Sequence, residues 1–310
     1  YQGAGSSLVN PTKSPENIMD EIKKSSLNVT GFVQGYERNA KHKQHLIDQA
    51  VVAAKQAKAS GDTILIFAGL DEISETEGMD RSHMNLPDAQ NKLIEAVLEV
   101  TDKVVVVLSA GSAVTLPWAD KVPGILHRYL GGQAGASAAV AILTGDMCPG
   151  GRLNESYPYK YEDTPAYNYY PSKERSSEHR EGLFVGYRYY ETAGVNVRYP
   201  FGYGLSYTTF EYSNLSVNND GITLKLRNTG NHGGSEVVQL YIGRKSDNIF
   251  RPVKELKGFK RVSLAVGEEK EVTIPFDDKT FRFFDVRTNS WAIEDGEYEI
   301  MVGSNVRDIK

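Results

Sequence analysis

The sequence predicts an α/β fold followed by an all-β sandwich, and three observations support this prediction. Short apolar runs alternate with helical patterns over residues 1–157, and this order implies a largely parallel sheet between helix layers. From about Thr208 the helical periodicity gives way to alternating apolar and polar runs separated by turn residues. The 310 residues also exceed the about 250–300 that one core supports. We therefore expect domains at 1–157 and 208–310, with a tyrosine-rich connector at 158–207 packed on them.

The first domain is expected to alternate strands and helices. Apolar residues on one helical face indicate buried helix stripes, and a run of four valines and a leucine is typical of a parallel strand covered on both faces. A proline marks the expected start of the second helix. In chain order we expect a weak strand at Ser26–Phe32, a helix at His45–Ala59, a central strand at Thr63–Ala68, a helix beginning at Pro87, strands at Val104–Leu108 and Gly124–Tyr129, and a helix at Gly135–Leu143.

The second domain is expected to be an antiparallel sandwich of the immunoglobulin type. Its alternating runs place apolar side chains on one face only, and turn residues such as Asn219-Asp220-Gly221 and Glu294-Asp295-Gly296 lie between them. The expected strands include Ile222–Leu226, Glu236–Ile242, Glu271–Pro275 and Tyr298–Val302.

Composition excludes several classes of function. The net charge is −5 and no basic stripe occurs, so we expect no nucleic-acid partner. No apolar run reaches the roughly 18–20 residues that span a bilayer, and the first residues show no leader pattern. Cys148 is the only cysteine, which favours a reducing, cytoplasmic location while leaving secretion and the periplasm open. The six histidines show no ligand spacing, so we expect neither a metal nor a cofactor.

The stretch Glu75–Arg81 is the most informative for function. It follows the expected strand at Thr63–Ala68, and open α/β sheets bind ligands beyond the carboxyl ends of their strands. Taken alone, the four acids within Asp71–Glu77 favour a solvated surface loop. Together with the sequence segments around it, however, the loop is better interpreted as part of a functional site.

Seven segments together carry a family pattern, in family order and over nearly the whole chain. They are Tyr1–Pro11 (YQGAGSSLVNP), Gly69–Pro87 (GLDEISETEGMDRSHMNLP), Val104–Trp118 (VVVVLSAGSAVTLPW), Gly131–Pro158, Glu181–Tyr190 (EGLFVGYRYY), Tyr199–Phe210 (YPFGYGLSYTTF) and Asn228–Tyr241 (NTGNHGGSEVVQLY). With them the chain resembles the C-terminal part of glycoside hydrolase family 3, of the β-glucosidase and β-xylosidase type.

The resemblance implies an enzyme of three parts: a barrel, an α/β sandwich and a fibronectin type III-like sandwich. We expect this chain to hold the second and third parts. In the family the barrel supplies an aspartate nucleophile and the α/β domain lends the general acid/base. The expected partners are therefore an N-terminal barrel of the same enzyme and a β-glucoside or related oligosaccharide, with homo-oligomerisation left open.

The resemblance makes Glu77 the first candidate for the acid/base and Glu75 the second. A retaining glycosidase needs two carboxyl groups about 5–5.5 Å apart, and the acid needs an environment that raises its pKa. Gly78 would give the loop freedom to turn over the sugar.

Three further residues are candidates for substrate binding, each with a structural alternative. Asp80 and Arg81 are more readily interpreted as a structural pair, in which Arg81 holds the loop through a bidentate carboxylate contact. Trp118 could stack on a sugar, but a core or interface position is favoured.

Other segments offer weaker hypotheses. Gln2–Ser7 resembles a phosphate-binding loop only superficially, because it lacks the Gly-Lys-Ser/Thr ending. Ser109–Ser112 is expected to be a tight turn that lies near the site in the less favoured alternative. Two rival functions stay open: a non-catalytic carbohydrate-binding or scaffold module, and a family member that has lost activity.

Overall fold

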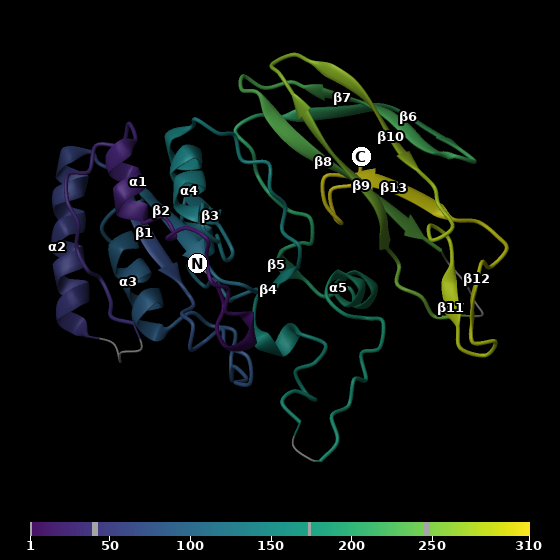
Figure 1. Cartoon of the computed structure of the whole chain (residues 1–310), viewed down its shortest axis with the longest axis horizontal. Coiled ribbons are helices and arrows are strands. Elements are labelled where there is room, and N and C mark those ends of the chain that lie inside the picture. The colour runs from purple at the N-terminus through teal and green to yellow at the C-terminus, as the bar shows by residue number, and fades with distance from the viewer. Residues whose placement is uncertain (1, 39–42, 173–174, 245–248) are drawn as a thin grey trace. The chain divides into compact units, whose positions relative to one another are not determined.

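The structure is a computed structural model that describes residues 2–38, 43–172, 175–244 and 249–310. Tyr1, which opens the first of the seven matching segments, lies outside these residues. The chain divides into two compact units. One is Tyr1–Met147 with Tyr159–Tyr161, and the other is Cys148–Pro158 with Glu162–Lys310. Figure 1 shows the elements of each unit along the chain.

A parallel sheet between helix layers forms the first unit, as the sequence predicted. The sheet has the order β1-β2-β3, with β1 at Ile64–Gly69, β2 at Val104–Ser109 and β3 at Gly124–His127. Helix α2 packs against α3, and α1 packs against α4 (Figure 1). These helices span Ile18–Lys24 (α1), Gln44–Ser60 (α2), Asp88–Leu98 (α3) and Gly135–Thr144 (α4), with short 3₁₀ turns at Gly5–Ser7 and Ala119–Lys121.

Two local expectations differ from the structure. The strand expected at Ser26–Phe32 is absent, because this exposed segment pairs with no sheet edge and leaves Phe32 74% exposed. Helix α1 was not expected. Its start is fixed by the side chain of Asn17, which accepts hydrogen bonds from the backbone N–H groups of Met19 and Asp20.

The end of β1 is held tightly, and this fixes where the acidic loop begins. The side-chain amide of Gln90 accepts from the Gly69 N–H at 2.8 Å and donates to the Gly69 carbonyl at 2.9 Å. A Cβ atom on Gly69 would lie 2.0 Å from the Ser109 carbonyl oxygen of β2, so only glycine fits here.

The sandwich of the second unit consists of two antiparallel sheets, β10-β7-β6 and β13-β8-β9. Apolar residues of both sheets form one core, including Leu226, Leu240 and Val272, each fully buried. The strands are β6 (Phe210–Asn218), β7 (Gly221–Asn228), β8 (Gly234–Gly243), β9 (Glu255–Leu264), β10 (Glu269–Pro275) and β13 (Glu299–Gly303), with a hairpin of β11 (Phe283–Asp285) and β12 (Ser290–Ala292). The fibronectin type III-like architecture is confirmed.

The tyrosine-rich connector is structured. It contains a 3₁₀ turn at Tyr161–Asp163 and helix α5 (Tyr187–Ala193), and its strands β4 (Tyr157–Pro158) and β5 (Val197–Tyr199) pair. The Tyr187 ring stacks on Phe201 with ring centroids 4.6 Å apart, and its hydroxyl accepts from the Leu256 N–H on β9 at 2.8 Å. The hydrogen bond from Leu256 therefore ties this stretch to the sandwich.

Within the described ranges, no helix combines the length and apolar character that crossing a membrane requires.

Candidate active-site loop

The loop between β1 and α3 carries the acids, and the first two of them have structural partners. The Asp71 carboxylate accepts from both the N–H and the hydroxyl of Ser74 at 2.9 Å, which closes a turn. Glu72 forms an exposed ion pair with Arg38. Asp71 therefore stabilises a turn and Glu72 lies at the surface, as expected if these two acids belong to a solvated surface loop.

Glu75 ties the loop to the turn after β2. Its Oε1 accepts from the Gly111 N–H at 2.5 Å, and a Cβ atom on Gly111 would lie 3.0 Å from that oxygen. The turn at Ser109–Ser112 thus adjoins the acidic loop. This position is the less favoured of the two alternatives given for it above. One carboxylate oxygen of Glu75 is committed to a backbone contact.

Glu77 lies two residues further on and is exposed to solvent. Its Oε2 accepts a hydrogen bond from the Ser6 N–H at 2.9 Å. The neighbouring backbones also pair, because the Ala4 N–H donates to the Glu75 carbonyl at 3.1 Å and the Glu77 N–H donates to the Ala4 carbonyl at 3.4 Å. The glycine-rich segment near the N-terminus therefore runs beside the candidate proton donor, a contact that the sequence analysis did not predict.

The hydrogen bonds from Ser6 lower the pKa of the Glu77 carboxyl below its usual range, because they stabilise the charged form. This direction is opposite to the raised pKa that a general acid needs. The group that would raise it is therefore not among the residues that surround Glu77 in the described part of the chain.

Gly78, Asp80 and Arg81 complete the loop. Gly78 has a φ of +82°, the left-handed conformation that favours glycine. Arg81 donates from Nη2 to the Ser112 hydroxyl at 2.8 Å. The bidentate carboxylate contact proposed for Arg81 is therefore wrong among the described residues, although the guanidinium does fasten the loop to the turn after β2.

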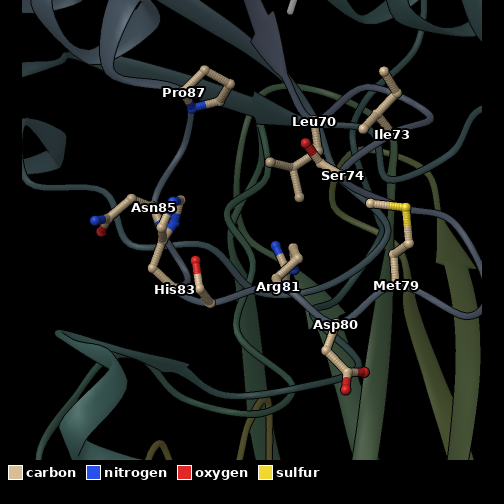
Figure 2. A pocket seen from close by; sticks show the side chains of 10 residues that line it. Leu70, Ile73, Ser74, Met79, Asp80, Arg81, His83, Asn85 and Pro87 are labelled. Carbon is tan, nitrogen blue, oxygen red and sulfur yellow. The ribbon is translucent and has the colours of Figure 1, made fainter. Parts of the chain in front are cut away.

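A hollow of about 310 Å³ opens beside this part of the loop (Figure 2). In that view Asp80 directs its carboxylate away from Leu70 and Pro87, which lie on the opposite side of the hollow. The lining residues mix apolar and polar side chains: Leu70, Ile73, Ser74, Met79, Asp80, Arg81, Ser82, His83, Asn85 and Pro87. Neither Glu75 nor Glu77 belongs to this lining.

Trp118 is a core residue, as the favoured of the two interpretations predicted. It is 1% exposed, and its indole Nε1–H donates to Asn91 Oδ1 on α3 at 2.9 Å. Its ring has no exposed face for a sugar in this structure.

In the part of the chain that the structure describes, no three His, Cys, Asp or Glu side chains gather as metal ligands would.

Comparison with known proteins matches both units. The model of the glycosyl hydrolase family 3 C-terminal domain covers residues 1–207, and that of the fibronectin type III-like domain covers residues 236–306. Thermostable β-glucosidase B of Acetivibrio thermocellus is 43% identical over the whole chain, which spans 42% of that protein. An exo-α-(1→6)-L-arabinopyranosidase of Bifidobacterium breve is 39% identical, again over the whole chain and 41% of the relative.

A crystal structure of a family 3 β-glucosidase from Bifidobacterium adolescentis superimposes with a TM-score of 0.91 at 36% identity. The match covers 98% of this chain and 45% of that protein. The chain thus spans less than half the length of these relatives, and what it matches is their C-terminal part. The chain belongs to glycosyl hydrolase family 3.

Proposed function

We propose that this chain is the acid/base-bearing part of a retaining β-glycosidase that hydrolyses terminal β-linked sugars, with β-glucosides as the preferred class. The proposal places the nucleophilic aspartate on a barrel outside these residues. It is supported by family membership and by relatives that are named β-glucosidases. One relative is named an arabinopyranosidase, so the comparisons support the glycosidase activity more strongly than they support glucose as the sugar.

One observation carries the choice of Glu77 as the proton donor. Its carboxylate is exposed at the carboxyl end of the parallel sheet, and among the described residues its hydrogen bonds come from Ser6, whose backbone N–H donates to Oε2. Glu75, by contrast, is half-buried and bound to the Gly111 N–H. A proton donor needs an oxygen that can reach the substrate, so Glu77 fits the role better and Glu75 fits an anchoring role.

The proposed mechanism uses Glu77 twice. In the first step its carboxyl protonates the departing glycosidic oxygen while the nucleophile attacks the anomeric carbon. In the second step the Glu77 carboxylate takes a proton from the water that releases the sugar. Because Ser6 lowers the pKa of Glu77, the first step requires a nearby negative charge to raise it.

Replacement of Glu77 by glutamine in an enzyme that joins this chain to its barrel tests the proposal. Glu77→Gln should abolish turnover of alkyl β-glucosides, whose leaving groups need protonation, and should spare 2,4-dinitrophenyl β-glucoside more. The matched control is Glu75→Gln, which should weaken the loop and affect both substrates alike. Equal loss on both substrates with Glu77→Gln would count against Glu77 as the acid.

The chain by itself should be inactive, because the proposal places the nucleophile on a barrel outside these residues. Hydrolysis of an aryl β-glucoside by the purified 310-residue chain at an ordinary enzymatic rate would contradict the proposal. Saturable binding of glucose or cellobiose by the chain alone, measured by calorimetry, would instead favour a carbohydrate-binding module.

A further inference from the structure

The segment Gln2–Val9 is a closed loop that braces itself. The Val9 N–H donates to the Gln2 side-chain Oε1 at 3.0 Å, which joins the two ends of the loop. Inside it, the Ser7 hydroxyl donates to the Ala4 carbonyl at 2.9 Å and the Leu8 N–H donates to the Gly5 carbonyl at 3.1 Å. These contacts give the loop a defined shape despite its exposure.

The two glycines of this loop let it approach the acidic loop. A Cβ atom on Gly3 would lie 2.7 Å from Ser7 Oγ in the same loop and 3.3 Å from the Glu75 carbonyl oxygen. A Cβ atom on Gly5 would lie 2.9 Å from the Glu77 Cβ. Gly5 also has a φ of +73°, which other residues rarely adopt. Between them Ala4 forms a parallel bridge with Thr76. The Gly-Ala-Gly sequence is therefore what close contact with the acidic loop requires.

Ser6 holds the Glu77 carboxylate in two ways. Its backbone N–H donates to Oε2 at 2.9 Å, and its side chain also hydrogen-bonds to the carboxylate. A carboxylate held by neighbouring donors keeps a defined orientation. Proton transfer needs such placement, because a 1 Å error in position can cost about 100-fold in rate.

We propose that Ser6 is a positioning residue for the proton donor: its backbone N–H holds Glu77 Oε2, and its contacts orient the carboxylate for proton transfer to the glycosidic oxygen. This inference rests on the proposed function. It assigns the Gln2–Val9 loop a role in catalysis without direct contact with the sugar.

The lowered pKa of Glu77 is explained by Ser6 and not by a neighbouring charge. The segment 2–10 and the turn at Ser109–Ser112 contain no charged residue. The charged side chains beside Glu77 on its own loop are Glu75, Asp80 and Arg81. The lowered pKa of Glu77 arises from its hydrogen bonds with Ser6.

Two variants test the contact in the chain as it stands. Ser6→Pro removes both the N–H and the hydroxyl of Ser6, and Gly5→Ala drives a methyl group into Glu77. In an NMR titration of the glutamate carboxyl groups, Glu77 of the unmodified chain should titrate below the ordinary value of about 4.3. Both variants should return it toward that value. Identical titration in all three proteins would overturn the contact.

The matched control is Gly61→Ala at the end of α2. Gly61 also has a positive φ, +78°, but the nearest atom to its Cβ position is Lys103 Nζ at 4.0 Å. This variant carries the same backbone strain without touching Glu77, so its Glu77 titration should be unchanged. In a Trp291→Phe background, fluorescence of the buried Trp118 checks that each variant is folded.

Kinetics of the enzyme that includes the barrel test the catalytic role. Gly5→Ala and Ser6→Pro should lower kcat/KM for alkyl β-glucosides about 10- to 100-fold. They should lower it by less than about threefold for 2,4-dinitrophenyl β-glucoside, which needs little protonation. Equal loss on both substrates would overturn the positioning role.

The failure of the proposed function is distinguishable from the failure of this inference. If Glu77→Gln leaves alkyl glucoside turnover intact, the proposed function falls and the catalytic role of Ser6 falls with it. If Glu77→Gln abolishes that turnover while Gly5→Ala and Ser6→Pro do not reduce it, only the inference about Ser6 is overturned.

Discussion

Burial of His127 should make the stability of the first unit depend on pH. His127 ends β3, and its ring contacts that of Tyr129 in a tilted arrangement, with ring centroids 4.0 Å apart and an interplanar angle of 53°. Burial lowers the pKa of His127 to about 4, and the hydrogen bond with the Leu108 backbone offsets this only in part. In the unfolded chain a histidine titrates near about 6.5. The folded unit therefore favours the neutral ring.

The sign and the size of the effect follow from these two pKa values. Between about pH 6.5 and 4 the unfolded chain binds more protons than the folded one, so stability is complete above this window and is lost as pH falls through it. Comparing pH 7 with pH 5, the loss attributable to His127 is about 2 kcal/mol.

Urea denaturation at the two pH values measures this loss. A Trp291→Phe background removes the exposed indole of the second unit, so that fluorescence reports on Trp118, which is buried in the first. His127→Gln cannot take up the proton and should lose about 2 kcal/mol less than the parent between pH 7 and pH 5. Carboxylates that titrate in both proteins cancel in this difference. Equal losses in parent and variant would refute the argument.

Two further predictions concern stability. Arg152→Leu should cost about 3–5 kcal/mol, because it leaves the Glu236 carboxyl, 4% exposed, without its cationic partner, whereas adding Glu236→Leu should restore much of the loss. Urea denaturation followed by far-UV circular dichroism checks both, and an unchanged single variant would contradict the prediction. Gln90→Leu should cost about 1–3 kcal/mol by leaving the Gly69 N–H and carbonyl without their amide partner. Trp118 fluorescence in urea measures this, and a loss near zero would contradict it.

The sequence was sufficient for elements whose pattern is strong and local. The valine run of β2 is buried on both faces, as a central parallel strand should be, and the apolar stripe of α2 faces inward at Leu46, Ile47 and Ala54. The weak strand predicted at Ser26–Phe32 failed because the segment pairs with neither edge of the sheet β1-β2-β3. Availability of an edge is a property of the whole fold that no local pattern contains.

The position of the acidic loop was predictable, but the partners of its acids were not. Topology alone places the loop at the carboxyl end of a parallel strand. The contact of Ser6 with Glu77 joins residues 71 positions apart. The only sequence feature related to this contact is Gly3-Ala4-Gly5. Two glycines allow another segment of backbone to approach closely, but they do not identify that segment.

The low proton affinity of Glu77 fits the second half of the proposed reaction better than the first. A carboxylate held ionised by Ser6 is ready to accept a proton from water. To donate one, it needs an added negative charge, and in the proposed enzyme a nucleophilic carboxylate about 5–5.5 Å away would supply that charge. Once the nucleophile is esterified by the sugar, its charge disappears and the pKa of Glu77 falls back toward the value set by Ser6. The Gln2–Val9 loop would thus set the base form of the residue, and the barrel would supply the acid form.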